Sequence, residues 1–478
     1  MNERRIAMAE NEYISPLTNR YGTNEMRRIF SDNFKYRTWR QLWCDLAVAE
    51  KELGLDITTE QTSEMTTHMY DAIDYDKVRR YENELHHDVM AHLREFCDKC
   101  PTAEPIIHLG ATSCYITDNT DILLMNSALS VIKHRISILM FELYNFCNKF
   151  KGTVTMAHTH LQPAQPTTVG KRGCMWLQDI DMDRDIINSI ELKMLGCNGA
   201  TGTQASFLEL FDGDDYKVMR LNAILAKRIM GNEDAYMLIS GQTYTRKIDA
   251  IVLDALSGIA QSVHKMCSDI RLLQGMHEIC EPFGNKQVGS SAMAYKQNPI
   301  KCENICSLAR HIISITMTSK MNVCTQWLER SLDDSANRRI IISEAFILTD
   351  HILNECSKII NGLVVNDGII NRHIKDNIPF IAMESIIMNA TKVGISRQEA
   401  HSRIRDLSTT ATRNVLAGRD NNLLELIKDD KVLGCIEIDV DPDKMIGMAQ
   451  KQTERYLSQV KKKLHKEDYV NESNRTVW

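Results

Sequence analysis

Apolar residues recur at intervals of three and four along three long stretches of the chain. The stretches cover residues 124–139, 252–273 and 346–360, and polar residues fill the positions between. This spacing matches the 3.6-residue period of an α-helix, whereas the alternation typical of strands is rare and short. The pattern therefore predicts an all-α protein.

The placement of proline favours long helices. No proline occurs between Pro166 and Pro282, or between Pro299 and Pro379. Because proline inside a helix removes a hydrogen bond and clashes with the preceding turn, such tracts permit long helices. Helices of more than 20 residues span about 30 Å or more, so we expect a long central bundle. The wide apolar stripes favour packing on several neighbours, including those of another subunit.

Breaks in the helical pattern divide the chain into three predicted units. They fall near residues 101–110 and 362–368, where glycine, proline and polar residues gather. We expect an N-terminal helical domain over residues 1–111, a central long-helix bundle over 112–364, and a C-terminal helical domain over 365–478. A chain of 478 residues is long enough for two or three packed units.

Composition excludes several classes of function. The chain has 57 basic and 63 acidic residues, a net charge of −6, so it has no general attraction for nucleic acid or anionic membranes. No apolar run reaches the roughly 18 residues of a membrane helix. Any anionic ligand must be held by local arginines and lysines. Partners are therefore expected to be small molecules and further copies of the chain.

The cysteines and the N-terminus indicate a cytoplasmic protein. Fourteen cysteines are scattered without a dense framework, and the first residues lack the apolar core of a signal peptide. Cys97 and Cys100 form one CxxC pair, but no second pair at zinc-ribbon spacing accompanies them. Neither a metal nor an organic cofactor is predicted.

The segment GSSAMAYKQNP, at residues 289–299, carries the first candidate chemistry. Backbone amides, Lys296 and Asn298 can surround a carboxylate or an enolate-like oxyanion, and the hydroxyls of Ser290 and Ser291 can reach a substrate carbon. Composition alone also fits a polar capping loop between helices.

The segment MAHTHLQPAQPTTVGK, at residues 156–171, contains two histidines. His158 and His160 have no nearby carboxylate or thiol to complete a metal site. A histidine titrating near neutrality can instead protonate a departing nitrogen, although a lone histidine is more often structural.

The third segment comprises ELHHDVMAH at residues 84–92 and IHLGATSC at 107–114. On one continuous helix, Glu84, Asp88 and His92 would share a face, yet the outer two would lie roughly 12 Å apart, too far to share one ion. Hydrogen bonding of a substrate by this segment is the better prediction, and a solvated helix face is the alternative. The GATS turn suits a helix N-terminus, where amides and hydroxyls meet a carboxylate.

Residues 289–299 and 156–171 resemble the two signatures of the fumarase/aspartase superfamily, GSSxMPxKxNP and THxQPAQxTTxGK. Members abstract a proton beside a carboxylate and expel an amine or a hydroxyl. The resemblance implies that His160, which matches the histidine of the second signature, is the general acid. It also implies that Ser290 is the base.

Three further segments narrow the match within that superfamily. SPLTNRY at 15–21, GQTYTRK at 241–247 and QWLERSLDDSANRR at 326–339 resemble the adenylosuccinate lyases of animals, and the similarity runs from about residue 13 into the C-terminal region. The resemblance implies that substrate is bound by Arg20, Tyr21, His86, His87, Asp88, Thr112, Ser113, Thr159, Gln242, Lys296, Asn298, Arg330, Ser335 and Arg339.

The chain departs from the family pattern at four positions. Ala294 replaces a proline, His86 replaces an arginine, Asn304 stands where arginine is common, and Gln297 replaces a basic residue. The implied acid, the implied base, Lys296 and Asn298 are all present. Activity is therefore expected. The four departures should affect mainly nucleotide affinity and the rigidity of the 289–299 loop.

The resemblance implies a fumarate-releasing β-elimination in purine nucleotide synthesis. It acts on adenylosuccinate, giving AMP, and on succinylated aminoimidazole carboxamide ribotide, giving the amide. It also implies a homotetramer with active sites shared between subunits. The alternatives are argininosuccinate lyase, fumarase, or a non-catalytic helical scaffold. Planar, permanently charged arginines suit a nucleotide phosphate. For the arginines in DDSANRR, residues 333–339, ion pairing with Asp333 or Asp334 on the same helix is the alternative.

Overall fold

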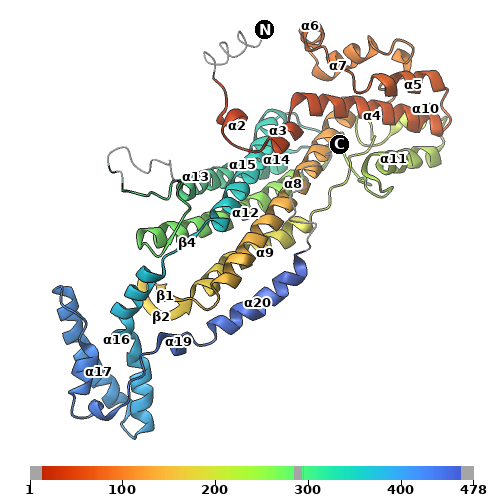
Figure 1. Ribbon diagram of the computed structural model, residues 1–478. Helices are drawn as coiled ribbons and strands as arrows, with labels where there is room; N and C mark the ends of the chain where they lie inside the picture. Colours follow the sequence, from red (N-terminus) through yellow and green to blue (C-terminus); the bar gives the residue numbers. More distant parts are fainter. Residues whose placement is uncertain (1–12, 285–292, 294, 465–478) are drawn as a thin grey trace.

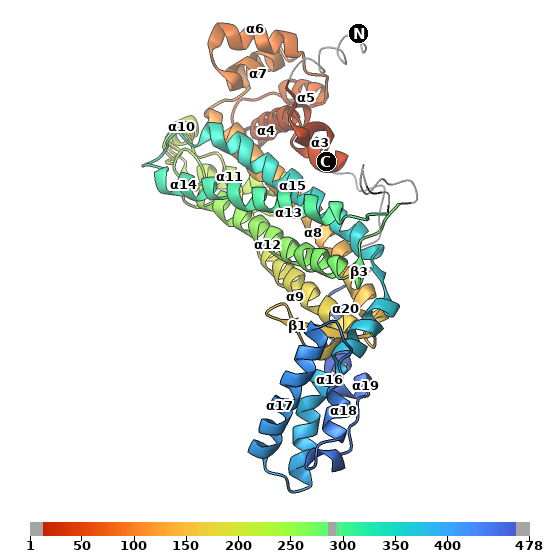
Figure 2. The ribbon, with the colours of Figure 1, turned by 90° about the vertical axis from the view of Figure 1, so that its left-hand side faces the viewer.

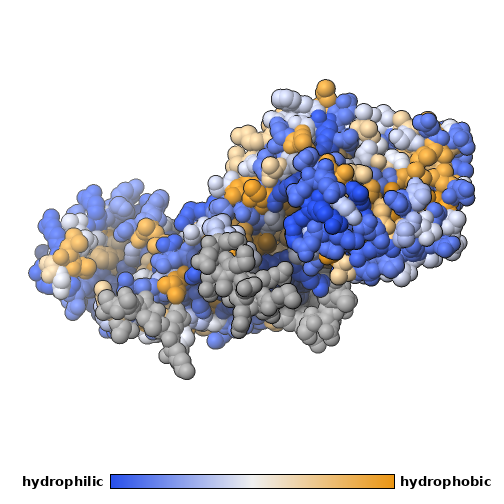
Figure 3. Space-filling model, turned by 90° about the horizontal axis from the view of Figure 1, so that it is seen from above, coloured by the Kyte–Doolittle hydropathy of each residue, from blue (hydrophilic) through white to orange (hydrophobic). Residues whose placement is uncertain are grey.

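The computed structural model describes residues 13–284, 293 and 295–464, and it is almost entirely α-helical, as the periodicity predicts. Ser290, Ser291 and Ala294 lie outside the described residues. The molecule is elongated: a helical head sits at one end of a long bundle, and a small helical unit projects from the other (Figures 1 and 2). Seen from above, its surface is mainly hydrophilic, with separate hydrophobic patches (Figure 3).

Five long helices form the bundle. The chain runs away from the head in α8, α12 and α15 and returns in α9 and α13, so neighbouring helices are largely antiparallel. The five are α8 (Ser113–Lys149), α9 (Val169–Asn188), α12 (Lys247–Gly275), α13 (Ile300–Ile315) and α15 (Ser335–Asn361). Two further helices, α14 (Met317–Thr325) and α20 (Ala449–Lys463), pack beside them.

The bundle core is built from the periodic apolar positions. Val252, Ile259, Val263 and Ile270 of α12 are all fully buried, as are equivalent residues of α8 and α15. Among the described helices, α8 alone has the length and apolar composition to cross a membrane. Just over half of its most apolar window is buried inside the bundle, which accounts for that composition.

The head gathers helices from two separate parts of the chain. Its core joins Trp39, Trp43 and Phe96 from the N-terminal part to Phe207 and Leu221 from the middle. The helices near it are α2 (Pro16–Asn19), α3 (Asn24–Ile29), α4 (Asp32–Glu52), α5 (Thr59–His68), α6 (Tyr75–Leu85), α7 (Asp88–Cys97), η1 (Glu104–Ile106), α10 (Ala205–Leu210) and α11 (Asp215–Met230).

The far end of the bundle carries one β-hairpin, a second short antiparallel strand pair and the projecting unit. Strands β1 (Val154–Thr159) and β2 (Gln162–Thr168) pair with each other, and β3 (Ile279–Cys280) pairs with β4 (Val364–Val365). The projecting unit has its own apolar core. It contains α16 (Asp367–Lys392), α17 (Arg397–Leu416), α18 (Leu423–Lys428), η2 (Leu433–Cys435) and α19 (Pro442–Met445).

One carboxyl group in the head core has no polar partner. The side chain of Glu50 on α4 is fully buried, and neither of its oxygens has a hydrogen-bond partner among the described residues. Burial raises the pKa of Glu50 to about 9, because the apolar surroundings disfavour the charged form. The folded protein therefore keeps this group protonated at neutral pH.

We expect Glu50 to make the protein less stable as pH rises. Since its pKa is higher in the folded state than in the unfolded state, the folded form holds a proton that the unfolded form releases above about pH 4.5. Between pH 6 and 8 this group alone should remove roughly 1.4 kcal/mol of unfolding free energy per pH unit. Glu50→Gln should abolish that slope in denaturant titrations at fixed protein concentration. Glu52→Gln, on the exposed face of the same helix, is the control; parallel curves for wild type and Glu50→Gln would contradict the assignment.

Candidate active site

Two helix N-termini meet where the head joins the bundle. His87 is the N-cap of α7, and its Nδ1 accepts a hydrogen bond from the amide of Met90 (3.4 Å). Its Nε2 lies 3.4 Å from the hydroxyl of Ser113, the first residue of α8. Thr112, the N-cap of α8, makes no capping hydrogen bond through its side chain. The GATS turn thus opens a 37-residue helix, as predicted, beside His87 and Asp88.

The segment before α12 lies against the segment before α15 at the same place. The amide of Gln242 donates to the carbonyl of Glu329 (2.9 Å), and Nη1 of Arg330 donates to Oε1 of Gln242 (2.8 Å). Gly241 permits this approach, because a Cβ there would lie 2.5 Å from the Glu329 carbonyl oxygen. Arg330 also contacts the thiol of Cys114, whose pKa burial raises to about 11.

Arg339 completes this head-end set of predicted residues. Its guanidinium lies 3.5 Å from the carboxylate of Asp88, and both side chains are partly open to solvent. Ser335 is the first residue of α15, one turn earlier. The head-end set, as the term is used below, comprises His87, Asp88, Thr112, Ser113, Gln242, Arg330, Ser335 and Arg339.

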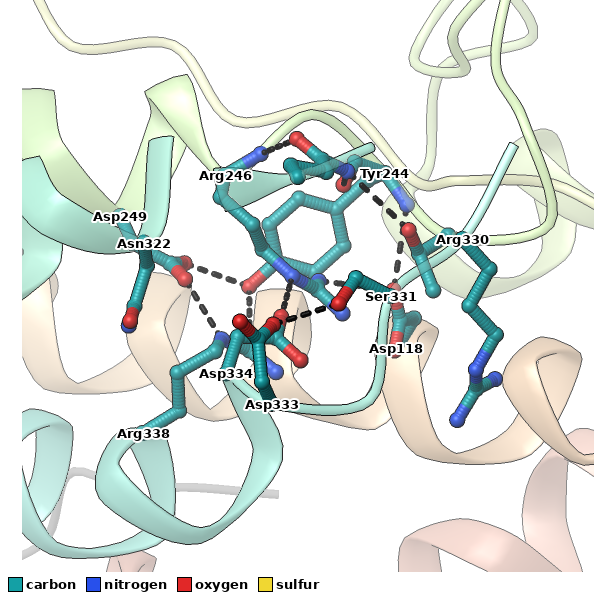
Figure 4. Close-up of polar contacts among 12 residues, drawn as sticks. Asp118, Tyr244, Arg246, Asp249, Asn322, Arg330, Ser331, Asp333, Asp334 and Arg338 are labelled. Atoms are coloured by element: carbon teal, nitrogen blue, oxygen red, sulfur yellow. Dashed lines mark hydrogen bonds and ion pairs between the residues drawn. The ribbon is translucent and has the colours of Figure 1, made fainter. Parts of the chain in front are cut away.

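A buried ion-pair network lies behind the head-end set and was not predicted (Figure 4). The guanidinium of Arg246 pairs with Asp118 of α8 (2.9 Å) and with Asp334, the N-cap of α15. Its backbone amide donates to the side chain of Gln326 (2.8 Å), which in turn donates to the Tyr244 carbonyl (2.9 Å). Arg246 therefore ties together both segments that carry Gln242 and Arg330.

The second arginine of the network faces deeper into the bundle. Arg338 pairs with Asp249 of α12 (2.6 Å) and Asp121 of α8 (3.0 Å), and it contacts the hydroxyl of Tyr244. The alternative of ion pairing within α15 is thus wrong for Arg338. The signal available in the sequence was a pair of acidic residues three apart, Asp118 and Asp121, near the start of a helix whose buried residues are mainly apolar.

Residues 84–92 do not form the continuous helix considered for them. Helix α6 ends at Leu85, and His86 follows in the left-handed conformation with φ 50°. The chain then restarts as α7, on which His92 is buried against the ring of Tyr36 (3.7 Å between centroids). Burial lowers the pKa of His92 to about 4, so it is neutral. Glu84 instead pairs with Arg94 (3.4 Å).

The predicted acid, His160, lies at the tip of the β1–β2 hairpin. Thr159 pairs with Gln162, so His160 and Leu161 form a two-residue turn with φ values of 54° and 59°. Positive φ at both central positions matches a type I′ turn, which Asn-Gly adopts with far less strain. His160 and Thr159 are exposed, and Leu161 is 67% exposed.

The remaining predicted residues occupy two other places. Lys296 and Asn298 lie just before α13, at the end of the bundle away from the head. Arg20 and Tyr21 follow α2, and the Tyr21 ring makes an edge contact with His351 of α15 (5.1 Å between centroids).

A single chain does not bring the predicted residues together. At about 1.5 Å per residue, the 37 residues of α8 place Ser113 and the β1–β2 hairpin roughly 55 Å apart. Along α15, His351 lies roughly 24 Å from Ser335. A nucleotide is much shorter than the separation between the head-end set and the hairpin that carries His160.

Two further observations concern metal sites and cavities in the described part of the chain. Among its histidines, cysteines, aspartates and glutamates, no group of three or more is placed to hold a metal ion. A cavity of about 320 Å³ lies between the β1–β2 hairpin and the segment leading into α20, and it is lined by Thr159, Gln165, Lys171, Met448 and Gln452 among others. The cavity therefore adjoins the hairpin that carries His160.

Comparison with family models covers most of the chain. Residues 19–314 match a model described as "Lyase", and residues 379–456 match one described as "Adenylosuccinate lyase C-terminus". The first match includes the β1–β2 hairpin and the loop before α13, and the second covers most of the projecting unit.

The relatives described next match nearly the whole chain, and all are named adenylosuccinate lyase. The chain is 42% identical to the adenylosuccinate lyase of Schistosoma mansoni over 94% of each chain. It is 43% identical to that of Schizosaccharomyces pombe, over 93% of this chain and 94% of the relative. An archaeal adenylosuccinate lyase, from Pyrococcus horikoshii, is 31% identical over 94% of this chain and 98% of its own.

Solved structures share the fold at low sequence identity. The β-carboxy-cis,cis-muconate cycloisomerase of Acinetobacter calcoaceticus superposes with a TM-score of 0.79 at 21% identity, covering 93% of this chain and 99% of its own. A fumarate lyase from a Mesorhizobium species gives a TM-score of 0.76 at 21% identity, covering 91% and 98%.

Proposed function

The chain belongs to the adenylosuccinate lyase family, and on this premise we propose that it eliminates fumarate from adenylosuccinate, giving AMP. By the same reaction it converts succinylated aminoimidazole carboxamide ribotide to the amide. The observation that carries the proposal is similarity above 40% over nearly the whole of both chains. Argininosuccinate and malate are the competing substrates.

The proposed elimination moves one proton in each direction. Ser290 takes a proton from the succinyl carbon next to a carboxylate, the electron pair forms the double bond of fumarate, and the C–N bond breaks. His160 then protonates the departing nitrogen. Lys296 and Asn298 stabilise the dianion that precedes bond breaking. The hairpin position of His160 supports this role, because an exposed imidazole can approach a ligand held elsewhere.

Nucleotide binding is assigned to arginines from two places. Arg330 and Arg339 of the head-end set, with Arg20, offer planar permanent cations to a phosphate. The side chains of Arg20, Arg330 and Arg339 are all exposed in the single chain. His87, Thr112 and Ser113 then face the succinyl group from the N-termini of α7 and α8.

We propose a homotetramer in which each active site draws residues from several chains. Its support is the separation described above: no single chain places His160 near the head-end set. The bundle also presents large apolar side chains to solvent in this single chain, as expected of a surface that packs against further copies. They include Met175, Met182, Ile186, Ile251, Leu272 and Ile340.

A cytoplasmic location is part of the same proposal. All fourteen cysteines are free thiols in the structure. Cys267 and Cys356 have their sulfur atoms 3.8 Å apart in the core without a disulfide. Proteins rich in unpaired cysteines are typical of reducing compartments.

We expect the purified protein to convert adenylosuccinate to AMP and fumarate, followed by the change in ultraviolet absorbance. Argininosuccinate and malate should be tested in parallel at equal concentrations. Turnover should persist with a chelator present, because the proposed acid and base are side chains. Activity confined to argininosuccinate or malate would contradict the assignment, and so would loss of activity to the chelator that added metal restores.

A further inference from the structure

Helix α13 begins without a cap of its own. Its N-cap is Pro299, which has no side-chain acceptor, and no capping hydrogen bond comes from it. The first amides of a helix lack partners within that helix, so they need acceptors from elsewhere. The need matters here because Lys296 and Asn298 lie immediately before α13.

The acceptors come from Glu281, at the start of the segment that connects β3 to α13. The Glu281 side chain is buried, at 2% exposure. Its Oε1 accepts from the amide of Lys301 (3.1 Å) and its Oε2 from the amide of Cys302 (3.0 Å). A carboxylate at a helix N-terminus is favoured by both the charge-assisted hydrogen bonds and the helix dipole.

Gln274 braces the same junction from the last turn of α12. Its Nε2 donates to the carbonyl of Gln297 (3.0 Å), and its Oε1 accepts from the amide of Glu281 (3.0 Å). The side chain is 5% exposed. One carboxamide thus joins the start of the connecting segment to its end.

These contacts fix the backbone on both sides of Asn298. Gln297 is held through its carbonyl, and Lys301 through its amide. Short local hydrogen bonds continue the restraint: the Lys296 amide donates to the Met293 carbonyl (3.0 Å), and the Ile300 amide to the Asn298 carbonyl (2.9 Å).

We propose that Glu281 and Gln274 are positioning residues for the elimination. They hold the backbone that presents Lys296 and Asn298 to the developing dianion, and neither touches the substrate. The proposal rests on the proposed function. It states that these two residues set the position of the groups that stabilise the transition state, and that they do not affect nucleotide binding. A displacement of catalytic groups by about 1 Å can lower the rate roughly 10²-fold, so loss of these contacts should lower kcat.

Two substitutions test the brace at its two ends. In Glu281→Gln one oxygen still accepts a hydrogen bond, but the NH₂ group faces the second amide of α13 and cannot accept from it. Gln274→Met keeps length and loses both hydrogen bonds. Each variant should lower kcat roughly 10²-fold, while inhibition by AMP should stay within about twofold of wild type, since the nucleotide residues lie on other segments.

The control is a helix cap of similar structural value placed far from the site. Asp214→Ala removes the N-cap of α11 in the head, where the Asp214 side chain accepts from the Lys217 amide (3.1 Å). It should lower the temperature of thermal unfolding slightly, with kcat unchanged. Folding of all variants is checked by circular dichroism and thermal unfolding.

The inference fails if folded Glu281→Gln and Gln274→Met both keep a kcat within about twofold of Asp214→Ala. It also fails if kcat and AMP binding fall together in proportion, because that outcome indicates general loosening. Wild-type protein in the same assay separates the two proposals, since its failure to turn over adenylosuccinate would overturn the proposed function itself.

Discussion

Replacing His160 by alanine is expected to lower kcat roughly 10²–10⁴-fold in a protein that remains folded, because the variant lacks the proposed general acid. Folding should survive because the imidazole is exposed at a hairpin tip. The matched control is His160→Asn, since asparagine tolerates the left-handed conformation at φ 54° but donates no proton at neutral pH. Both variants should be inactive, and only the alanine should strain the turn.

Mixed oligomers sharpen this prediction. When chains carrying His160→Ala are co-assembled with chains carrying Ser290→Ala, some pockets receive both native residues if these come from different chains. At equal amounts about one quarter of wild-type specific activity should return, since each pocket draws the two residues independently. Demonstrated mixed oligomers without recovery would mean that both residues come from one chain, or that one is not catalytic.

Arg246→Met is expected to destabilise the protein by about 3–5 kcal/mol, because it leaves Asp118 and Asp334 buried without their cation. Arg246→Lys should cost less stability but should weaken AMP inhibition about tenfold, since a single ammonium cannot reproduce the guanidinium fork that ties the two segments. Denaturant titration and AMP inhibition at fixed enzyme concentration measure the two effects.

The control for Arg246 is Arg220→Met. Arg220 pairs with Glu233 in the head (3.8 Å), and the two side chains are 42% and 58% exposed, so its loss should cost no more than about 1 kcal/mol. Equal destabilisation by the two substitutions would show that the buried network contributes no more to the free energy of unfolding than an exposed ion pair does. Unchanged AMP inhibition in Arg246→Lys would separate the network from nucleotide binding.

Much of the fold was predictable because helical periodicity is a local property. The three periodic stretches became α8, α12 and α15, and their apolar positions line the core. The GATS turn also opens a helix as expected. The break between α6 and α7 was missed, because His86 adopts a left-handed conformation that its residue type does not signal strongly.

The site was predictable as a set of residues but not as an arrangement. Motifs name His160, Lys296 and Arg330 without saying which ends of the bundle they occupy. The partners of Arg246 lie up to 128 residues away along the chain, so no local pattern could pair them. Likewise, Glu281 caps a helix that begins 19 residues later, where a proline occupies the usual capping position.

The length of α8 restricts how copies of this chain can complete one another. A rod with half of a site at each end closes nothing when it packs beside a parallel copy, because like ends then meet. An antiparallel pair, related by a twofold axis perpendicular to the rod, brings unlike ends together twice. The two places where unlike ends meet would be separated by approximately the length of α8, roughly 55 Å, so ligand could not pass directly from one to the other. In a tetramer the second pair of chains can add its residues at each of these places.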